Sequence, residues 1–231
     1  MKPMAARKDV RVLIVEDHAL FAESLELALS MEGYDVRRAP VSPSGGSVST
    51  LFGAAARMRP SIALLDLDLG ATGDGVRLIA PLVANGVHVA VVTGSSDRAR
   101  WGECIRAGAR TVLAKTQPLN DILATVRRIN EGLPVMDRQE RDDLVRLWYE
   151  RRQRMQVLLE RLQQLTPREQ VVLGHLMKGH QVREIADESV VAEATVRTQV
   201  KSILAKLEVS SQLAAVGMAH EIGWRPLAAA V

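Results

Sequence analysis

Residues 62–70 read Ile62-Ala-Leu-Leu-Asp-Leu-Asp-Leu-Gly70, an apolar run that ends abruptly at an aspartate. The run is rich in Leu and too short for a helix, which is typical of a buried strand. Comparable apolar runs occupy residues 10–15, 87–92 and 111–114, and a weaker one lies at 34–38. Near-continuous apolar strands of this kind favour a parallel sheet that is covered on both faces.

Amphipathic segments separate these runs and predict the helices that cover the sheet. They lie at about residues 19–31, 50–58, 75–84, 97–106 and 119–131. Alternating strands and helices predict a doubly wound α/β domain with a five-stranded parallel sheet, of the flavodoxin-like type.

The composition is that of a globular chain with room for two domains. The 231 residues are 47% hydrophobic and 25% charged. No stretch approaches the ~18 apolar residues of a membrane span, and no apolar core follows the basic N-terminus as in a secretory signal. The single cysteine, Cys104, excludes an internal disulfide. We therefore expect a cytoplasmic protein with no membrane partner. Its net charge of +3 is spread evenly and does not by itself predict nucleic-acid binding.

A polar, charge-rich helix is expected from about residue 137 to 165. Its seam residues repeat at spacings of three and four, a heptad pattern interrupted by an arginine. They are Leu144, Trp148, Arg151, Met155, Leu158, Leu162 and Leu165. Two interpretations stay open: the helix pairs with a second copy of the chain, or it packs on a neighbouring domain.

Four short helices are expected after this segment, at about 167–178, 181–187, 193–207 and 211–222. Thr166, Pro167 and Glu169 form a capping-box signature, and Gly179 is a candidate C-terminal cap. We predict three parts: a domain at 1–133, a helical linker and possible dimerisation helix at 134–161, and an all-α four-helix domain at 162–231.

Polar residues stand where the predicted strands end. In chain order they are Glu16, Asp17, Asp66, Thr93 and Lys115. Ligands of open parallel sheets bind at the carboxyl ends of the strands, and clustered carboxylates there suit a hard cation such as Mg²⁺. A carboxylate nucleophile beside a cation, a hydroxyl and an ammonium group predicts a site for a transferable phosphoryl group.

The motifs VLIVEDH, LLDLDLG, VVTGSS and GARTVLAK resemble the receiver domain of two-component response regulators over about residues 9–132. The resemblance implies that Asp66 accepts a phosphoryl group from a sensor histidine kinase. It also implies that Glu16 and Asp17 hold Mg²⁺ together with Asp66, and that Asp68 contributes its backbone carbonyl. Thr93 and Lys115 would contact the phosphoryl oxygens. The chain would not otherwise be an enzyme, because the acyl phosphate only hydrolyses slowly in a self-limited autophosphatase reaction.

Two positions depart from the receiver pattern. Val112 stands three residues before Lys115, where receivers usually carry an aromatic residue that relays the signal. The loop after the acceptor, LGATGDG, lacks the usual proline. The first departure puts the common aromatic relay in doubt, and neither removes the phosphorylation chemistry.

The segment at 193–207 has an apolar face and a basic face. Arg197, Thr198 and Lys201 share the side opposite Val196 and Val200. Such a helix can enter the major groove, where Arg and Lys contact guanine edges and phosphates. The alternative interpretation is an ordinary solvated helix face.

The motifs LTPREQVVLGHLMKG, VREIA, ATVRTQVKSILAKLEV and SSQLAAV resemble the LuxR-type helix-turn-helix domain over about residues 162–220. The whole chain then resembles a NarL/FixJ-type response regulator. The resemblance places base-reading roles on Arg197, Thr198 and Lys201, and backbone roles on Thr195, Gln199 and Lys206. Ala192 replaces a usual serine cap, Ser189 a usual buried leucine, Val182 an asparagine and Gln199 a histidine.

The first hypothesis is a DNA-binding transcription factor in which phosphorylation of Asp66 controls homodimerisation and binding to double-stranded DNA. A phosphorylation-independent LuxR-type regulator is a second hypothesis, motivated by Val112. A phosphotransfer or protein-interaction module that no longer binds DNA is a third. His175, His180 and His220 show no metal-ligand spacing and are expected to be structural.

Overall fold

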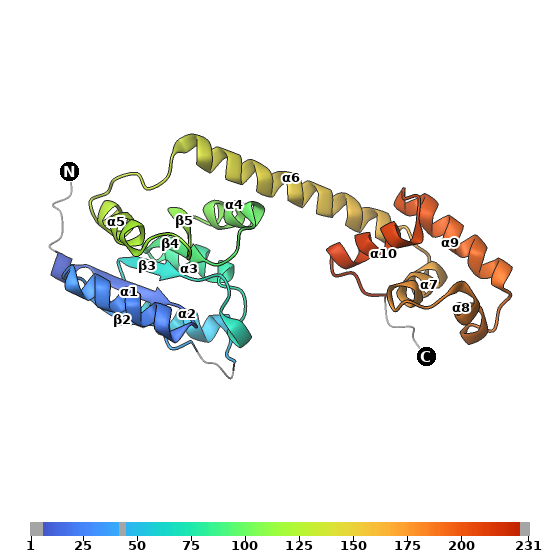
Figure 1. The fold of residues 1–231 in the computed structure, drawn as a ribbon, viewed down its shortest axis with the longest axis horizontal. Coiled ribbons are helices and arrows are strands. Elements are labelled where there is room, and N and C mark those ends of the chain that lie inside the picture. The colour runs from blue at the N-terminus through green and yellow to red at the C-terminus, as the bar shows by residue number, and fades with distance from the viewer. Residues whose placement is uncertain (1–6, 42–44, 227–231) are drawn as a thin grey trace. The chain divides into compact units, whose positions relative to one another are not determined.

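The computed structural model describes residues 7–41 and 45–226, which divide into two compact units between Tyr149 and Glu150. The first unit alternates strands and helices (Figure 1). Its strands are β1 (Arg11–Val15), β2 (Asp35–Arg38), β3 (Ile62–Leu65), β4 (His88–Thr93) and β5 (Thr111–Ala114). Its helices are α1 (Ala19–Met31), α2 (Val48–Arg57), α3 (Val76–Ala84), α4 (Arg98–Arg106) and α5 (Leu119–Asn130). Short 3₁₀ turns at Arg7–Asp9 and Gly70–Thr72 complete it.

The described strands form one five-stranded sheet in the order β2-β1-β3-β4-β5. All neighbouring strands are parallel, and the central register pairs Leu13 with Ala63 and Ala63 with Val89. The predicted fold class is thereby confirmed. The strand order reverses between β1 and β3, which is the switch point where doubly wound sheets bind their ligands.

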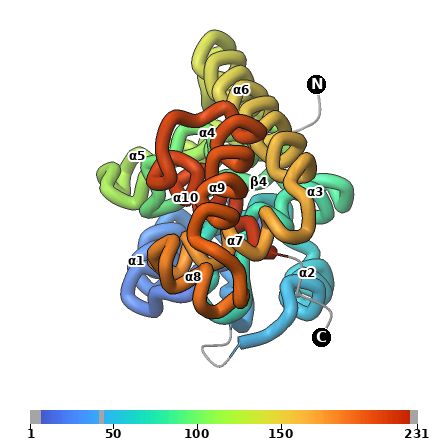
Figure 2. The backbone as a smooth tube through the Cα atoms, turned by 90° about the vertical axis from the view of Figure 1, so that its right-hand side faces the viewer, coloured from blue at the N-terminus to red at the C-terminus, as the bar shows by residue number. Residues whose placement is uncertain are grey.

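Alternate strand residues face two separate cores because successive side chains of a strand point to opposite faces. Leu13 and Leu65 belong to the core beneath α2, α3 and α4, whereas Ile14 and Leu64 belong to the core beneath α1 and α5. Figure 2 shows α1 and α5 on one side and α2 and α3 on the other. None of the residues of β2, at the edge of the sheet, is fully buried, which explains its weak apolar signal.

Helix α6 (Arg138–Gln163) begins in the first unit and ends in the second, and the two ends of its heptad seam pack in different cores. Leu144 is buried in the core beneath α4, and the Arg106 guanidinium lies over the Trp148 ring. Leu162 instead joins the core of the second unit. Arg151, between them, is exposed. Both ends of the seam therefore pack within the chain, and pairing of this helix with a second copy stays a prediction.

The second unit consists of the end of α6 with α7 (Pro167–Met177), α8 (Val182–Glu188), α9 (Glu193–Leu207) and α10 (Gln212–Glu221). The predicted capping box is present: the Glu169 amide contacts the Thr166 hydroxyl, and the Thr166 amide donates to the Glu169 carboxylate. Gly179 follows α7 with φ of +87°. Leu173, Ile185 and Val196 bring three of the helices together in one core.

The turn between α8 and α9 carries local strain. Val190 has φ of +53° and is 91% exposed. A β-branched residue in this left-handed region is a genuine outlier. Ala192 is the N-cap of α9 and offers no side-chain hydrogen bond, as the sequence predicts, and Ser189 is exposed at the end of α8. Among residues 7–41 and 45–226, no helix is long and apolar enough to cross a membrane.

Candidate functional site

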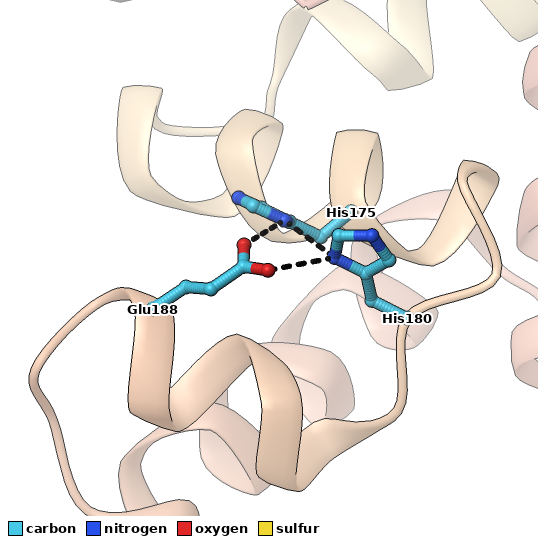
Figure 3. Close-up of side chains that lie close together, drawn as sticks. All are labelled: His175, His180 and Glu188. Carbon is cyan, nitrogen blue, oxygen red and sulfur yellow. Dashed lines mark hydrogen bonds and ion pairs between the residues drawn. The ribbon is translucent and has the colours of Figure 1, made fainter.

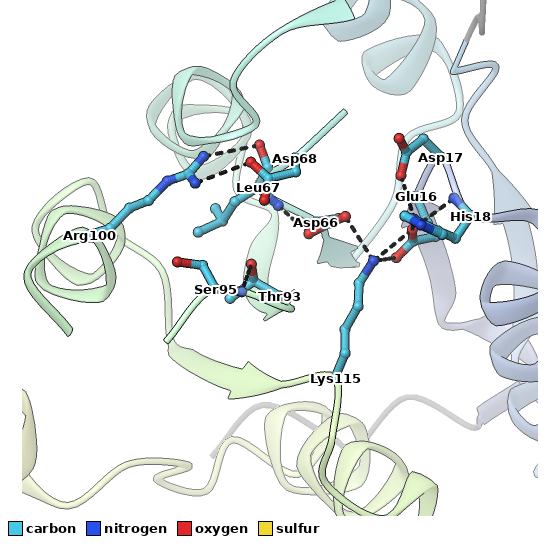
Figure 4. Close-up of polar contacts among 10 residues, drawn as sticks. All are labelled: Glu16, Asp17, His18, Asp66, Leu67, Asp68, Thr93, Ser95, Arg100 and Lys115. Atoms are coloured by element: carbon cyan, nitrogen blue, oxygen red, sulfur yellow. Dashed lines mark hydrogen bonds and ion pairs between the residues drawn. The ribbon is translucent and has the colours of Figure 1, made fainter. Parts of the chain in front are cut away.

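The polar residues predicted from the strand ends converge at the carboxyl edge of the sheet (Figure 4). Glu16 and Asp17 follow β1, Asp66 follows β3, Thr93 ends β4 and Lys115 follows β5. They meet because parallel strands end at the same edge. Asp66 and Thr93 are buried, whereas Asp17 faces solvent, so the pocket opens on one side only.

Asp66 is held at both oxygens of its carboxylate. Its Oδ1 accepts a 2.7 Å hydrogen bond from the Leu67 amide, and its Oδ2 lies 2.8 Å from Lys115 Nζ. Gly75 packs against its backbone so closely that a Cβ there would lie 2.1 Å from the Asp66 carbonyl oxygen. The start of α3 therefore packs directly on the backbone of Asp66, and only glycine fits at position 75.

Lys115 bridges two carboxylates. Its Nζ lies 2.8 Å from Asp66 Oδ2 and 2.7 Å from Glu16 Oε2. Burial acts to lower the pKa of Lys115, but the hydrogen bonds that its ammonium group donates to Asp66 and Glu16 outweigh burial and raise that pKa above its ordinary value. The ammonium group is therefore a fixed positive charge beside Asp66.

Four residues of the pocket offer ligand atoms within 4.8 Å of one another: Glu16, Asp17, His18 and Asp66. Three carboxylates against one ammonium leave the pocket with an excess of negative charge, and hard carboxylate oxygens are the ligands that Mg²⁺ prefers. The donor set therefore fits a divalent cation. His18 is the member that the sequence patterns missed: its Nδ1 lies 2.9 Å from Asp17 Oδ1 and 3.3 Å from Glu16 Oε1.

We expected Asp68 to contact the metal only through its backbone carbonyl. Its side chain contacts Arg100. Arg100, on α4, contacts Asp68 Oδ1 and Asp74 Oδ1, each at 3.1 Å. Asp68 is absent from the group of ligand atoms that gathers around Asp66 among the described residues. Arg100 was not predicted either, because nothing in the local sequence of α4 links it to a loop some thirty residues earlier.

The loop after β4 connects Thr93 to an aromatic residue. Thr93 Oγ1 accepts a 3.1 Å hydrogen bond from the Ser95 amide, and Trp101 Nε1 donates to the Ser95 carbonyl at 2.8 Å. Val112, which replaces the usual relay aromatic, is buried in the core beneath α4. Trp101, on α4, therefore contacts the loop after Thr93. The pocket itself is lined by the Phe21 ring, on α1, whose centroid lies 5.2 Å from Lys115 Nζ.

The predicted recognition helix, α9, presents an exposed polar face. Thr195, Arg197, Thr198 and Lys201 are exposed, whereas Val196 and Val200 are buried against the bundle. Arg197 forms a 3.1 Å ion pair with Glu193 on the same helix, and the Thr198 hydroxyl donates to the Ala194 carbonyl. Gln199 lies at the edge of this face and is half-buried.

Lys206, the last of the predicted DNA contacts, is engaged inside the bundle. Its Nζ lies 2.7 Å from Glu169 Oε2, and the Ser202 hydroxyl donates to Glu169 Oε1 at 2.6 Å. Glu169 is buried, and burial opposes its ionisation. The hydrogen bonds from Lys206, Ser202 and Thr166 outweigh burial and lower the Glu169 pKa to about 2.

A doubly wound sheet with an acidic pocket at its carboxyl edge, joined to a helix-turn-helix bundle, is the architecture of a response regulator. Residues 12–127 match the response regulator receiver domain, and residues 163–219 match the luxR family of bacterial regulatory proteins. The chain belongs to the NarL/FixJ-type response regulators, and it is a two-component transcription regulator.

Individual relatives agree with this membership. The chain is 30% identical to the response regulator protein VraR of Staphylococcus aureus (strain Mu3) over 209 residues, which cover 90% of this chain and 94% of VraR. Solved structures with a similar fold include RcsB of Salmonella typhimurium (TM-score 0.49, 19% identity, 90% of this chain and 98% of that one). The heme-sensing regulator ChrA is another (TM-score 0.43, 21% identity, 92% and 96%).

Proposed function

We propose that Asp66 is the residue through which this regulator receives its signal, as the acceptor of a phosphoryl group from a sensor histidine kinase. One observation carries the proposal: a buried carboxylate at the switch point of the sheet, fixed by the Leu67 amide and paired with Lys115 at 2.8 Å. An Asp66 oxygen attacks phosphorus, the phosphorus–nitrogen bond to the kinase imidazole breaks, and an acyl phosphate forms.

The other pocket residues complete this chemistry. Lys115 contacts the added phosphoryl oxygens as a compact positive charge, and the Thr93 hydroxyl donates to one of them. Glu16, Asp17 and Asp66 would hold Mg²⁺ by their carboxylates, and Asp68, whose side chain pairs with Arg100, would add its backbone carbonyl. A bound cation would supply positive charge that offsets the phosphoryl charge during transfer. Water later attacks phosphorus and releases inorganic phosphate, which makes the phosphorylated state self-limited.

We propose that α9 reads double-stranded DNA in the major groove. Its exposed face carries Arg197, Thr198 and Lys201 for base edges, and Thr195 and Gln199 for the backbone. Arg197 has to leave Glu193 to reach a base, which is inexpensive because both side chains are largely exposed. Lys206 is expected to position α9 through Glu169. To contact a phosphate of the DNA backbone, the Lys206 ammonium group would have to leave the buried Glu169 carboxylate.

Phosphorylation is expected to favour a homodimer that occupies two half-sites of DNA in the cytoplasm. A second function, regulation without phosphorylation, is favoured by one observation: Val112 lies in the core and provides no aromatic relay.

The test compares the wild type with Asp66→Asn and with Asp121→Asn, which removes an exposed carboxylate of α5 as a matched control. Each protein is treated with acetyl phosphate and Mg²⁺ and examined by intact mass and peptide mapping. We expect one added phosphoryl group on the wild type and on Asp121→Asn, and none on Asp66→Asn. A wild type that stays unmodified would instead support the phosphorylation-independent regulator.

A further inference from the structure

Three potential metal ligands converge between α7 and α8, outside the acidic pocket (Figure 3). His175 lies in the last turn of α7, His180 in the connection to α8, and Glu188 ends α8. The connection brings them together because Gly179 adopts a left-handed conformation and the His180 amide donates to the His175 carbonyl at 3.1 Å. The chain therefore folds back, and both imidazole rings face the Glu188 carboxylate.

The distances between the three groups match those between ligands of one small ion. His175 Nδ1 lies 3.1 Å from His180 Nδ1 and 3.0 Å from Glu188 Oε2. His180 Nδ1 lies 3.5 Å from Glu188 Oε1. With metal–ligand bonds of ~2.0–2.1 Å, neighbouring ligand atoms of a tetrahedral zinc site are about 3.3 Å apart. The observed trio spans one triangular face of such a tetrahedron.

The chemistry of the trio also favours a cation. A neutral imidazole carries one N–H proton, on either Nδ1 or Nε2. Two facing Nδ1 atoms form a hydrogen bond only when one of them carries its proton and the other does not. The carboxylate only accepts. When both rings carry their proton on Nε2, the two Nδ1 lone pairs and the carboxylate converge on one point, and imidazole and carboxylate are both acceptable ligands of zinc-like ions.

The site is open enough to load and to hold a water as fourth ligand. The side chains of His175, His180 and Glu188 are 20%, 32% and 49% exposed. No metal site is predicted here from the sequence, because residues five apart do not share one face of a continuous helix and Glu188 lies on another helix.

We propose that His175, His180 and Glu188 form a binding site for a divalent transition-metal ion of the zinc class. The ion ties the end of α8 to the end of α7, and α8 packs directly on the recognition helix α9 through Ile185 and Ala186. Metal occupancy thereby stabilises the helix-turn-helix unit. This proposal is independent of phosphorylation at Asp66.

The test is a zinc titration of the full-length protein in competition with a chromophoric chelator. All proteins carry His18→Ala, and excess Mg²⁺ is present, so that zinc does not bind at the acidic pocket. His180→Ala and Glu188→Gln each remove one ligand at an accessible position, and His220→Ala removes an exposed histidine of α10 as the control. We expect one zinc ion bound in the background protein, and affinity at least about tenfold weaker in each ligand variant but unchanged in His220→Ala.

A spectroscopic measurement decides the outcome if a variant loses structure, which circular dichroism will reveal. Zinc-edge X-ray absorption of the folded background protein should show two imidazoles among nitrogen and oxygen ligands, and zinc should raise the midpoint of thermal unfolding of the helical unit. Failure of the background protein to bind zinc would overturn the proposal. Zinc affinity in His180→Ala and Glu188→Gln equal to that of the background protein would also overturn it, as would a spectrum without imidazole.

Discussion

Replacing Glu169 by glutamine removes one negative charge from the helical unit and keeps the size of the side chain. In the wild type this carboxylate accepts hydrogen bonds from Lys206 Nζ at 2.7 Å, from the Ser202 hydroxyl at 2.6 Å and from the Thr166 amide at 2.7 Å. The amide of Gln cannot accept all three. The change also leaves the half-buried Lys206 ammonium without its counter-charge.

The magnitude follows from the pKa of this group. The network lowers the Glu169 pKa from 4.5 to about 2, and each pKa unit corresponds to about 1.4 kcal/mol, so the charge contributes up to about 3 kcal/mol to folding. Because the pKa in the folded state is the lower one, this stabilisation is complete above about pH 4.5. It declines as the pH falls from there towards about 2.

Hydrogen exchange of the full-length protein, read by mass spectrometry in peptides from α7, α9 and α10, measures the local free energy of opening. Glu221→Gln, on the exposed side of α10, is the matched control and should have almost no effect. Glu169→Gln should lose stability near neutral pH, and urea unfolding at about pH 3 should show a smaller difference from the wild type. A loss no larger than that of Glu221→Gln, or one that grows as the pH falls, would refute this reasoning.

Three further predictions follow from the same structure. Val190→Gly should stabilise the helical unit by about 1 kcal/mol in thermal unfolding, because it relieves a left-handed β-branched residue; a loss of stability would contradict this. Gly102→Ala should destabilise the first unit by about 1–3 kcal/mol or more and speed hydrogen exchange at the start of α6, since its Cβ would lie 2.0 Å from the Leu144 carbonyl oxygen. Gly217→Ala, whose Cβ would meet nothing within 4 Å, is its control. In a variant whose Trp148 and Trp224 are replaced by phenylalanine, Trp101 is the remaining tryptophan. Beryllofluoride should change the fluorescence of this variant if the loop after β4 relays the signal, and an unchanged spectrum would exclude that loop.

The sequence predicts the sheet and its pocket well because both depend on local pattern. Each strand is a short apolar run, and each pocket residue stands where a run ends, so Asp66 and Lys115 can be placed together before any coordinates are known. The capping box at Thr166 and the missing cap at Ala192 are equally local, and both are confirmed.

Contacts between distant segments could not be predicted in this way. Lys206 is an exposed basic residue by sequence, yet in three dimensions it pairs with Glu169, on another helix. Arg100 reaches Asp68 across the pocket, and the turn at Gly179 brings His175 to His180. Such pairs depend on how helices pack, and the periodicity of a single helix carries no information about its partner.

The most direct test of the central claim is the affinity for DNA of the full-length protein before and after phosphorylation. Binding is measured on duplexes selected from a random pool by the wild type, with and without acetyl phosphate and Mg²⁺, and in parallel with Asp66→Asn. We expect the phosphodonor to strengthen DNA binding by the wild type and to leave the affinity of Asp66→Asn unchanged. Equal affinity of the wild type with and without a phosphoryl group on Asp66 would contradict it.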